Sequence, residues 1–121
     1  MKTLMFSCVA LLTSMAAHAA DSTIYSCVPG SQPNGLGIKK LVLDVSNEDP
    51  EATMTLTYQN GGQPVVSNMA TEDSGTRIEL IPNSRRDGDL SVILVKKSGK
   101  WTANVKSATI DTFSVLDCQA K

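Results

Sequence analysis

The sequence is poor in the residue types that most enzymatic chemistry needs. Aromatic residues make up 4% of its 121 residues, and the one histidine, His18, lies close to the N-terminus. General bases and metal ligands that work near neutral pH are most often histidines, so this scarcity argues against hydrolytic and metal-dependent catalysis. We therefore predict a protein that is not an enzyme, with no catalytic residues, no metal ligands and no cofactor.

The first 19 residues indicate an export signal. A short basic start precedes the apolar run Leu4–Leu12, and small residues then lead to a cleavage point after Ala19 or Ala20. This run is too short to span a bilayer as a helix, and no later stretch is long enough. We therefore expect residues 1–19 to be a cleaved signal peptide and residues 20–121 to form one periplasmic or secreted domain without a membrane span.

The residues that remain after removal of the signal peptide are considered by their own charge and cysteine content. The chain beyond it holds ten basic and twelve acidic residues, which disfavours nucleic acid as a partner because nucleic-acid-binding domains are usually basic. Its only cysteines are Cys27 and Cys118, one near each end. In an oxidising compartment they are expected to form a disulfide, with a chain-entropy contribution of about 4 to 5 kcal/mol.

Short alternating segments predict an all-β domain with no helix. Leu41, Leu43 and Val45 alternate with polar or outward positions, as in a half-buried strand, and Ser98-Gly99 indicates a tight hairpin. The expected strands cover residues 23–28, 40–45, 53–58, 64–69, 76–81, 90–95, 101–106 and 112–118. Because the disulfide requires the first and last strands to be neighbours, we predict a small antiparallel eight-stranded barrel or a compact sandwich closed by one disulfide.

Three local expectations accompany this fold. Residues 30–37 read as a mobile loop because of their glycine and proline content. Tyr25, Tyr58 and Phe113 are assigned to the core, whereas Trp101 is left open between core and surface. The acidic residues fall in turns, where carboxylates are normally solvated, so neither a glycosidase pair nor a calcium loop is predicted.

The polar loops are then the strongest functional candidates, because loops on a rigid scaffold commonly carry binding function. One segment is residues 72–77, which contains Ser74, Gly75 and Arg77. The other is residues 83–87, where adjacent arginines can form bidentate pairs with carboxylates of a partner.

Three motifs resemble the periplasmic and membrane-bound inhibitors of c-type lysozyme. They are Tyr25-Ser26-Cys27, Ser74-Gly75-Thr76-Arg77 and Asp117-Cys118. The resemblance implies an exported eight-stranded barrel whose Ser-Gly loop enters the lysozyme cleft and whose later basic loop also contacts it. Carried over, Ser74 and Lys100 are the inhibitory contacts. The sequence departs from the family pattern at Ile78, where an aromatic is expected, and in the residue order around Trp101.

The sequence therefore predicts an exported, non-enzymatic binding or inhibitor module that presents polar loops to a protein partner, with a lysozyme-type glycosidase as the named partner. The predicted partner-binding residues are Ser74, Gly75, Arg77, Arg85, Arg86 and Lys100. Two alternatives stay open: a β-barrel carrier of a small ligand, and a structural accessory protein of the cell envelope.

Overall fold

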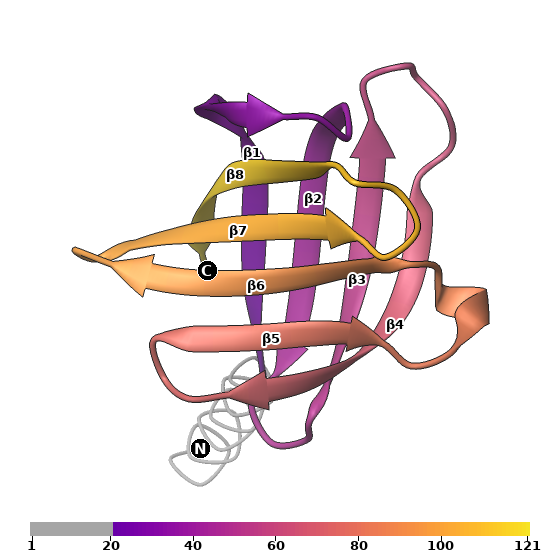
Figure 1. The fold of residues 1–121 in the computed structure, drawn as a ribbon. Helices are drawn as coiled ribbons and strands as arrows, with labels where there is room; N and C mark the ends of the chain where they lie inside the picture. Colours follow the sequence, from indigo (N-terminus) through magenta and orange to yellow (C-terminus); the bar gives the residue numbers. More distant parts are fainter. Residues whose placement is uncertain (1–20) are drawn as a thin grey trace, which may run out of the picture.

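The structure is a computed structural model that describes residues 21–121. These residues form a closed barrel of eight strands (Figure 1). The strands are β1 (Ser22–Asn34), β2 (Ile38–Ser46), β3 (Glu51–Tyr58), β4 (Val65–Asp73), β5 (Arg77–Pro82), β6 (Leu90–Lys97), β7 (Lys100–Ser107) and β8 (Phe113–Ala120). The predicted signal peptide lies outside the described residues. No helix in the described part is long and apolar enough to cross a membrane.

Each strand pairs antiparallel with the next one along the chain, and β8 returns to pair with β1. This closure excludes the sandwich alternative and confirms the all-β barrel. β5 to β8 run across the direction of β1 to β3 (Figure 1). A closed sheet leaves no unpaired strand edge, so a partner must meet a turn or a face of this barrel and cannot extend its sheet.

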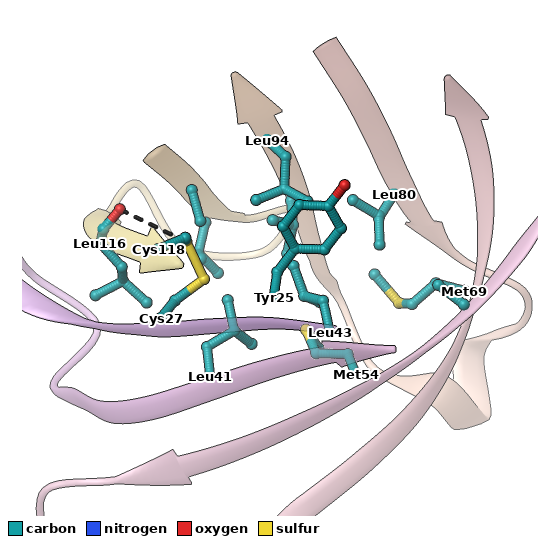
Figure 2. Packing of buried hydrophobic residues seen from close by; sticks show 14 of the residues in the cluster. Tyr25, Cys27, Leu41, Leu43, Met54, Met69, Leu80, Leu94, Leu116 and Cys118 are labelled. Carbon is teal, nitrogen blue, oxygen red and sulfur yellow. Dashed lines mark hydrogen bonds between the residues drawn. A yellow bond between two sulfur atoms is a disulfide. The ribbon is translucent and has the colours of Figure 1, made fainter. Parts of the chain in front are cut away.

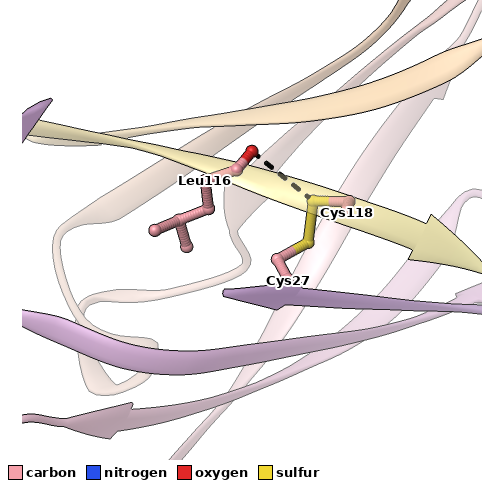
Figure 3. Close-up of a disulfide and its surroundings, with 3 residues drawn as sticks. All are labelled: Cys27, Leu116 and Cys118. Atoms are coloured by element: carbon pink, nitrogen blue, oxygen red, sulfur yellow. Dashed lines mark hydrogen bonds between the residues drawn. A yellow bond between two sulfur atoms is a disulfide. The ribbon is translucent and has the colours of Figure 1, made fainter. Parts of the chain in front are cut away.

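The disulfide between Cys27 and Cys118 closes the barrel at the seam between its first and last strands (Figure 3). The two residues are direct cross-strand partners, and their Cα atoms lie 4.0 Å apart. The predicted pairing is thereby confirmed. It is consistent with an oxidising, extracellular compartment, because paired cysteines persist as disulfides mainly there.

The core follows the alternation that the sequence predicted. Leu41, Leu43 and Leu56 are fully or almost fully buried, and Met54 and Met69 fill the space between the two sets of strands (Figure 2). Complete burial of such a side chain stabilises the fold by roughly 1.5–3 kcal/mol. The interior is therefore packed with the barrel's own apolar side chains.

The first strand is longer than predicted. Residues 30–34, expected to be part of a mobile loop, extend β1 to Asn34, after a register shift that begins at Pro29. The Asn34 side chain explains the extension, because it donates to the Ile38 carbonyl at 2.8 Å and accepts from the Ile38 amide and the Ser114 hydroxyl. Ser114 is fully buried, so these bonds hold the β1–β2 connection to β8.

The aromatic assignments are partly corrected. Tyr25 is buried, and Tyr58 and Trp101 are half-buried against the core. Phe113 was expected in the core but is 47% exposed. The reason is its register, because Ser114, two residues before Leu116, holds the inward position of β8 and leaves Phe113 on the outer face.

Two polar segments also differ from prediction. Residues 72 and 73, expected in a turn, belong to the end of β4. Between β5 and β6 the chain forms the short 3-10 helix η1 (Arg85–Asp87), where only a polar turn was predicted.

Candidate partner-binding surface

The β4–β5 turn is fixed by hydrogen bonds within its own backbone and side chains. The Ser74 amide and hydroxyl both donate to the Arg77 carbonyl, at 2.9 and 3.1 Å. The Gly75 amide donates to Asp73 Oδ1 at 2.8 Å, and Gly75 has a φ of 95°, a conformation that side chains disfavour. The turn thus presents Ser74 and Gly75 to solvent in one defined shape.

Arg77 follows that turn, and its charge is already compensated. Its Nη2 lies 2.8 Å from Glu79 Oε1, and its Nε donates to the same oxygen at 3.3 Å. Both side chains are exposed, so this pair contributes little to the free energy of unfolding. The ion pair leaves Arg77 less able to act as a free cation toward a partner.

The β6–β7 hairpin carries the uncompensated positive charge at this end of the barrel. Its two-residue turn, Ser98 and Gly99, has φ values of 53° and 77°. Lys97 and Lys100 face each other across the hairpin, and each is exposed. Within residues 21–121, neither lysine has an ion pair.

Lys96 has a different setting from the other two lysines of this hairpin. It is paired with Trp101, and its Nζ lies 5.9 Å from the centroid of the Trp101 ring. Trp101 in turn meets Tyr25 edge to face, with ring centroids 5.1 Å apart. A cation over an indole is attracted by the negative face of the ring, so this contact orients the Lys96 side chain.

The two turns lie side by side although they are separate in sequence. The Lys96 amide donates to the Thr76 carbonyl at 2.8 Å, which ties the base of one hairpin to the other. In Figure 1 both turns project on the same side of the barrel, at the left of the view. We call Ser74–Thr76 and Lys97–Lys100, with the strand ends beside them, the hairpin end. A groove of about 470 Å³ runs beside it, lined by Lys96, Lys100 and Trp101 among others.

A tyrosine lies beneath this surface. Burial raises the pKa of Tyr25, and the negative charge of Asp73 raises it further. The side chain therefore stays neutral to higher pH than an exposed tyrosine, which suits its place under the half-buried Trp101.

Arg85 and Arg86 do not belong to the hairpin end. They lie in η1, which contacts β4 and stands on the opposite side of the barrel in Figure 1. We call residues 83–89 the arginine loop. The structure thus divides the six predicted partner-binding residues into two groups, one at each end, so they cannot form a single contact patch.

The arginine loop is held in place by its two carboxylates. Asp87 accepts from the Asn68 amide at 2.9 Å and from the Ser84 hydroxyl at 3.1 Å. Asp89 accepts from the hydroxyl of Ser107, at the end of β7, and from that of Thr109, in the β7–β8 connection. The hydrogen bonds from Thr109 and Ser107 lower the pKa of Asp89, so its carboxyl stays ionised to lower pH.

A groove of about 480 Å³ on the outer face of β2 and β3 reaches the arginine loop. Asp44 and Glu51 line it together with Asp87 of that loop. In residues 21–121, no three His, Cys, Asp or Glu side chains are grouped so that they could hold a metal ion.

Lys96 was not among the predicted binding residues, and Trp101, left open between core and surface, lies half-buried beside it. Leu90, Val92, Leu94 and Lys96 occupy successive inward-facing positions of β6, so the alternation placed Lys96 at the rim of the barrel mouth. This alternation along β6 was the sequence pattern that could have identified Lys96. The predicted Ser98-Gly99 hairpin already implies that Lys96 and Trp101 are paired, but only the structure shows the Lys96 side chain over the indole ring.

Comparisons with known proteins add no relative, since no protein-family model, no curated protein and no solved structure matches the chain. The geometry of the two ends is therefore the basis for a functional conclusion. Of these, the hairpin end contains both Ser74 and Lys100, the two contacts that the resemblance implies.

Proposed function

We propose that this chain is an exported, non-enzymatic binding module that presents its hairpin end to a protein partner in the periplasm or outside the cell. One observation carries the proposal. The hydrogen bond from the Lys96 amide to the Thr76 carbonyl joins the Ser74-Gly75 turn to the hairpin of Lys100. Two polar turns distant in sequence thereby form one surface of fixed shape.

The physical properties of the hairpin end suit protein binding. Both turns are held by backbone hydrogen bonds, so little conformational entropy is lost on association. The unpaired Lys97 and Lys100 project positive charge, which favours a partner with an acidic surface or cleft and speeds encounter with it. Glycosidases commonly carry two carboxylates in their cleft. Together with the resemblance in sequence, this supports a lysozyme-type glycosidase as the partner and inhibition as the result.

The packing of the interior favours this reading over the alternative of a small-ligand carrier. A carrier barrel needs an internal cavity, whereas Leu43, Met54, Met69 and Leu80 fill the centre of this one (Figure 2). A carrier would also co-purify with its ligand, which native mass spectrometry detects as added mass on the intact chain.

Titration of the purified chain into a c-type lysozyme turnover assay tests the proposal. We expect inhibition at micromolar concentration, and Ser74→Ala and Lys100→Ala should each weaken it about tenfold, because charged and buried polar contacts at interface centres commonly contribute that much. Lys40→Ala is the matched control, since Lys40 is an exposed lysine on the outer face of β2. An uninhibited lysozyme, or equal inhibition by all three variants, would contradict the proposal.

A further inference from the structure

The arginine loop borders an apolar groove that the sequence did not indicate. This groove, about 540 Å³ in volume, lies between the end of β5 and the β7–β8 connection. Its apolar wall includes Ile81, Pro82 and Ala108, and Arg85 lies on the same groove. Ile81 is 58% exposed, so the groove offers a large aliphatic side chain for a ligand to contact.

The acidic and the basic side chains of the arginine loop have different surroundings. The carboxylates of Asp87 and Asp89 accept hydrogen bonds from the barrel and from the neighbouring connection. Arg85 and Arg86 are exposed, and within residues 21–121 their guanidinium groups have neither an ion pair nor a hydrogen bond. The loop therefore offers free cations to solvent, although it contains as many acidic as basic residues.

The loop is also held in one conformation before anything binds. Its backbone is tied at both ends, by the Asn83 amide to the Asn68 carbonyl and by the Ala108 amide to the Asp89 carbonyl, each at 3.0 Å. Since these contacts already fix the segment, a ligand there does not have to order it.

From these observations we infer that the arginine loop and its groove form a second docking surface. It takes an extended segment of a partner protein in which a carboxylate stands next to an aliphatic side chain. The aliphatic group lies against Ile81 and Pro82 in the groove, and the carboxylate pairs with the guanidinium of Arg85, whose planar donors match it. Arg86 adds positive charge at the rim.

An anionic membrane surface is the other occupant that apolar and basic groups could suit. The protein segment suits the charges of the loop better than a membrane does. An anionic membrane surface is recognised by a cluster of several basic residues, whereas the arginine loop holds two arginines and two carboxylates. The loop therefore suits a single carboxylate of a partner chain.

This surface is separate from the hairpin end, so the inference does not depend on the proposed function. If both hold, one molecule can contact two partners at once. A negative result in the lysozyme assay above would not bear on the arginine loop, because the experiment below uses no lysozyme.

The test is an NMR titration of the purified chain, labelled with nitrogen-15, with a capped hexapeptide of alternating glutamate and leucine. We expect amide shifts in residues 81–89 and at Ala108, while the Trp101 indole signal at the hairpin end stays in place. The matched peptide of alternating glutamine and leucine should bind about tenfold more weakly, because it lacks the charge-assisted bonds to arginine.

Two variants locate the contact. Arg85→Gln should weaken binding of the glutamate peptide about tenfold, and Ile81→Ser about fivefold, whereas Lys40→Gln should leave it within twofold. All three positions are exposed, and an unchanged thermal unfolding midpoint checks that each variant is folded.

Four outcomes overturn the inference. They are equal binding of the two peptides, binding that survives Arg85→Gln, shifts confined to the hairpin end, and no binding of either peptide at millimolar concentration. Sedimentation with phosphatidylglycerol vesicles that depends on Ile81, in the absence of peptide binding, assigns the surface to a membrane instead.

Discussion

The two ends of the barrel carry similar residues but use them differently. At the hairpin end the lysines stand on a projecting turn whose shape comes from backbone hydrogen bonds and two residues with positive φ. In the arginine loop, carboxylates adjacent to the arginines are bound by the barrel, so the arginines alone remain free. The formal charge of a polar loop is thus a poor guide to what the loop presents. The partners of each side chain decide that, and they come from strands far away in the sequence.

The largest expected effect tests whether the disulfide supports one end more than the other. Replacement of both Cys27 and Cys118 by serine should lower the free energy of unfolding by about 2–5 kcal/mol in urea denaturation. Cys118 pairs with Trp101, which pairs with Lys96, so amide exchange should accelerate more at the hairpin end than in the arginine loop. An equal acceleration at both ends would break the comparison.

A substitution in the arginine loop should loosen that end of the barrel instead of the hairpin end. Asp87→Ala removes the acceptor for the Asn68 amide and the Ser84 hydroxyl, which should lower the free energy of unfolding by about 1–2 kcal/mol. Exchange of the Asn68 amide should increase while that of Lys96 is unchanged. Ser84→Ala, which removes only one of the two hydrogen bonds, is the control and should have roughly half the effect on stability.

Alkaline pH should destabilise the barrel through two tyrosines, Tyr25 and Tyr58, whose pKa values are raised. Burial is the larger cause of the raised pKa of Tyr25 and of Tyr58, with Asp73 and Asp89 adding repulsion at their respective ends. A raised pKa in the folded state means that stability is fully present below the ordinary tyrosine value of 10.0 and is lost as the pH rises through the folded pKa.

Tyr25→Phe and Tyr58→Phe should each therefore reduce the loss of stability above that pH, measured by urea denaturation at a series of pH values. Tyr25→Phe should have the larger effect because Tyr25 is buried and Tyr58 only half-buried. A pH profile identical to that of the unsubstituted chain in both variants would show that neither tyrosine couples to folding.

The smallest expected effect is a gain in stability at the β6–β7 turn. Ser98 has a φ of 53°, a region that asparagine tolerates better than serine, and Asn-Gly is the preferred pair in such two-residue turns. Ser98→Asn should raise the free energy of unfolding by about 0.5 kcal/mol, measured by urea denaturation. Gly99→Ala, at a φ of 77°, should have the opposite sign.

The strands were predictable because their signal is local. Leu41, Leu43 and Val45 stand at alternate positions of one strand, and the structure buries each of them. The errors arose where a distant residue decides the outcome. Residues 30–34 read as a loop, yet the Asn34 side chain binds Ile38 and Ser114 and continues the strand. Phe113 is apolar and ends on the outer face, because the register of β8 is set by its pairing with both β1 and β7.

The sequence predicted individual residues of the candidate site but not which of them lie together. The sequence marked Ser74, Arg85 and Lys100 as polar turn residues, and each is exposed. Their grouping was not available, because whether two turns share an end depends on which strands pair, and the structure shows that each strand pairs antiparallel with the next. The groove beside Arg85 was likewise hidden, since its walls come from β5 and the β7–β8 connection.

The sequence by itself determined the all-β class, the inward and outward faces of most strands, and the one possible disulfide. These follow from a two-residue side-chain period and from the presence of only two cysteines beyond the N-terminal segment. The tertiary structure alone decided that the sheet closes as a barrel, that Ser74 lies near the Lys100 hairpin, and that the arginine loop stands apart from both. Those features depend on which strands pair with which and on contacts between distant residues, which no local pattern encodes.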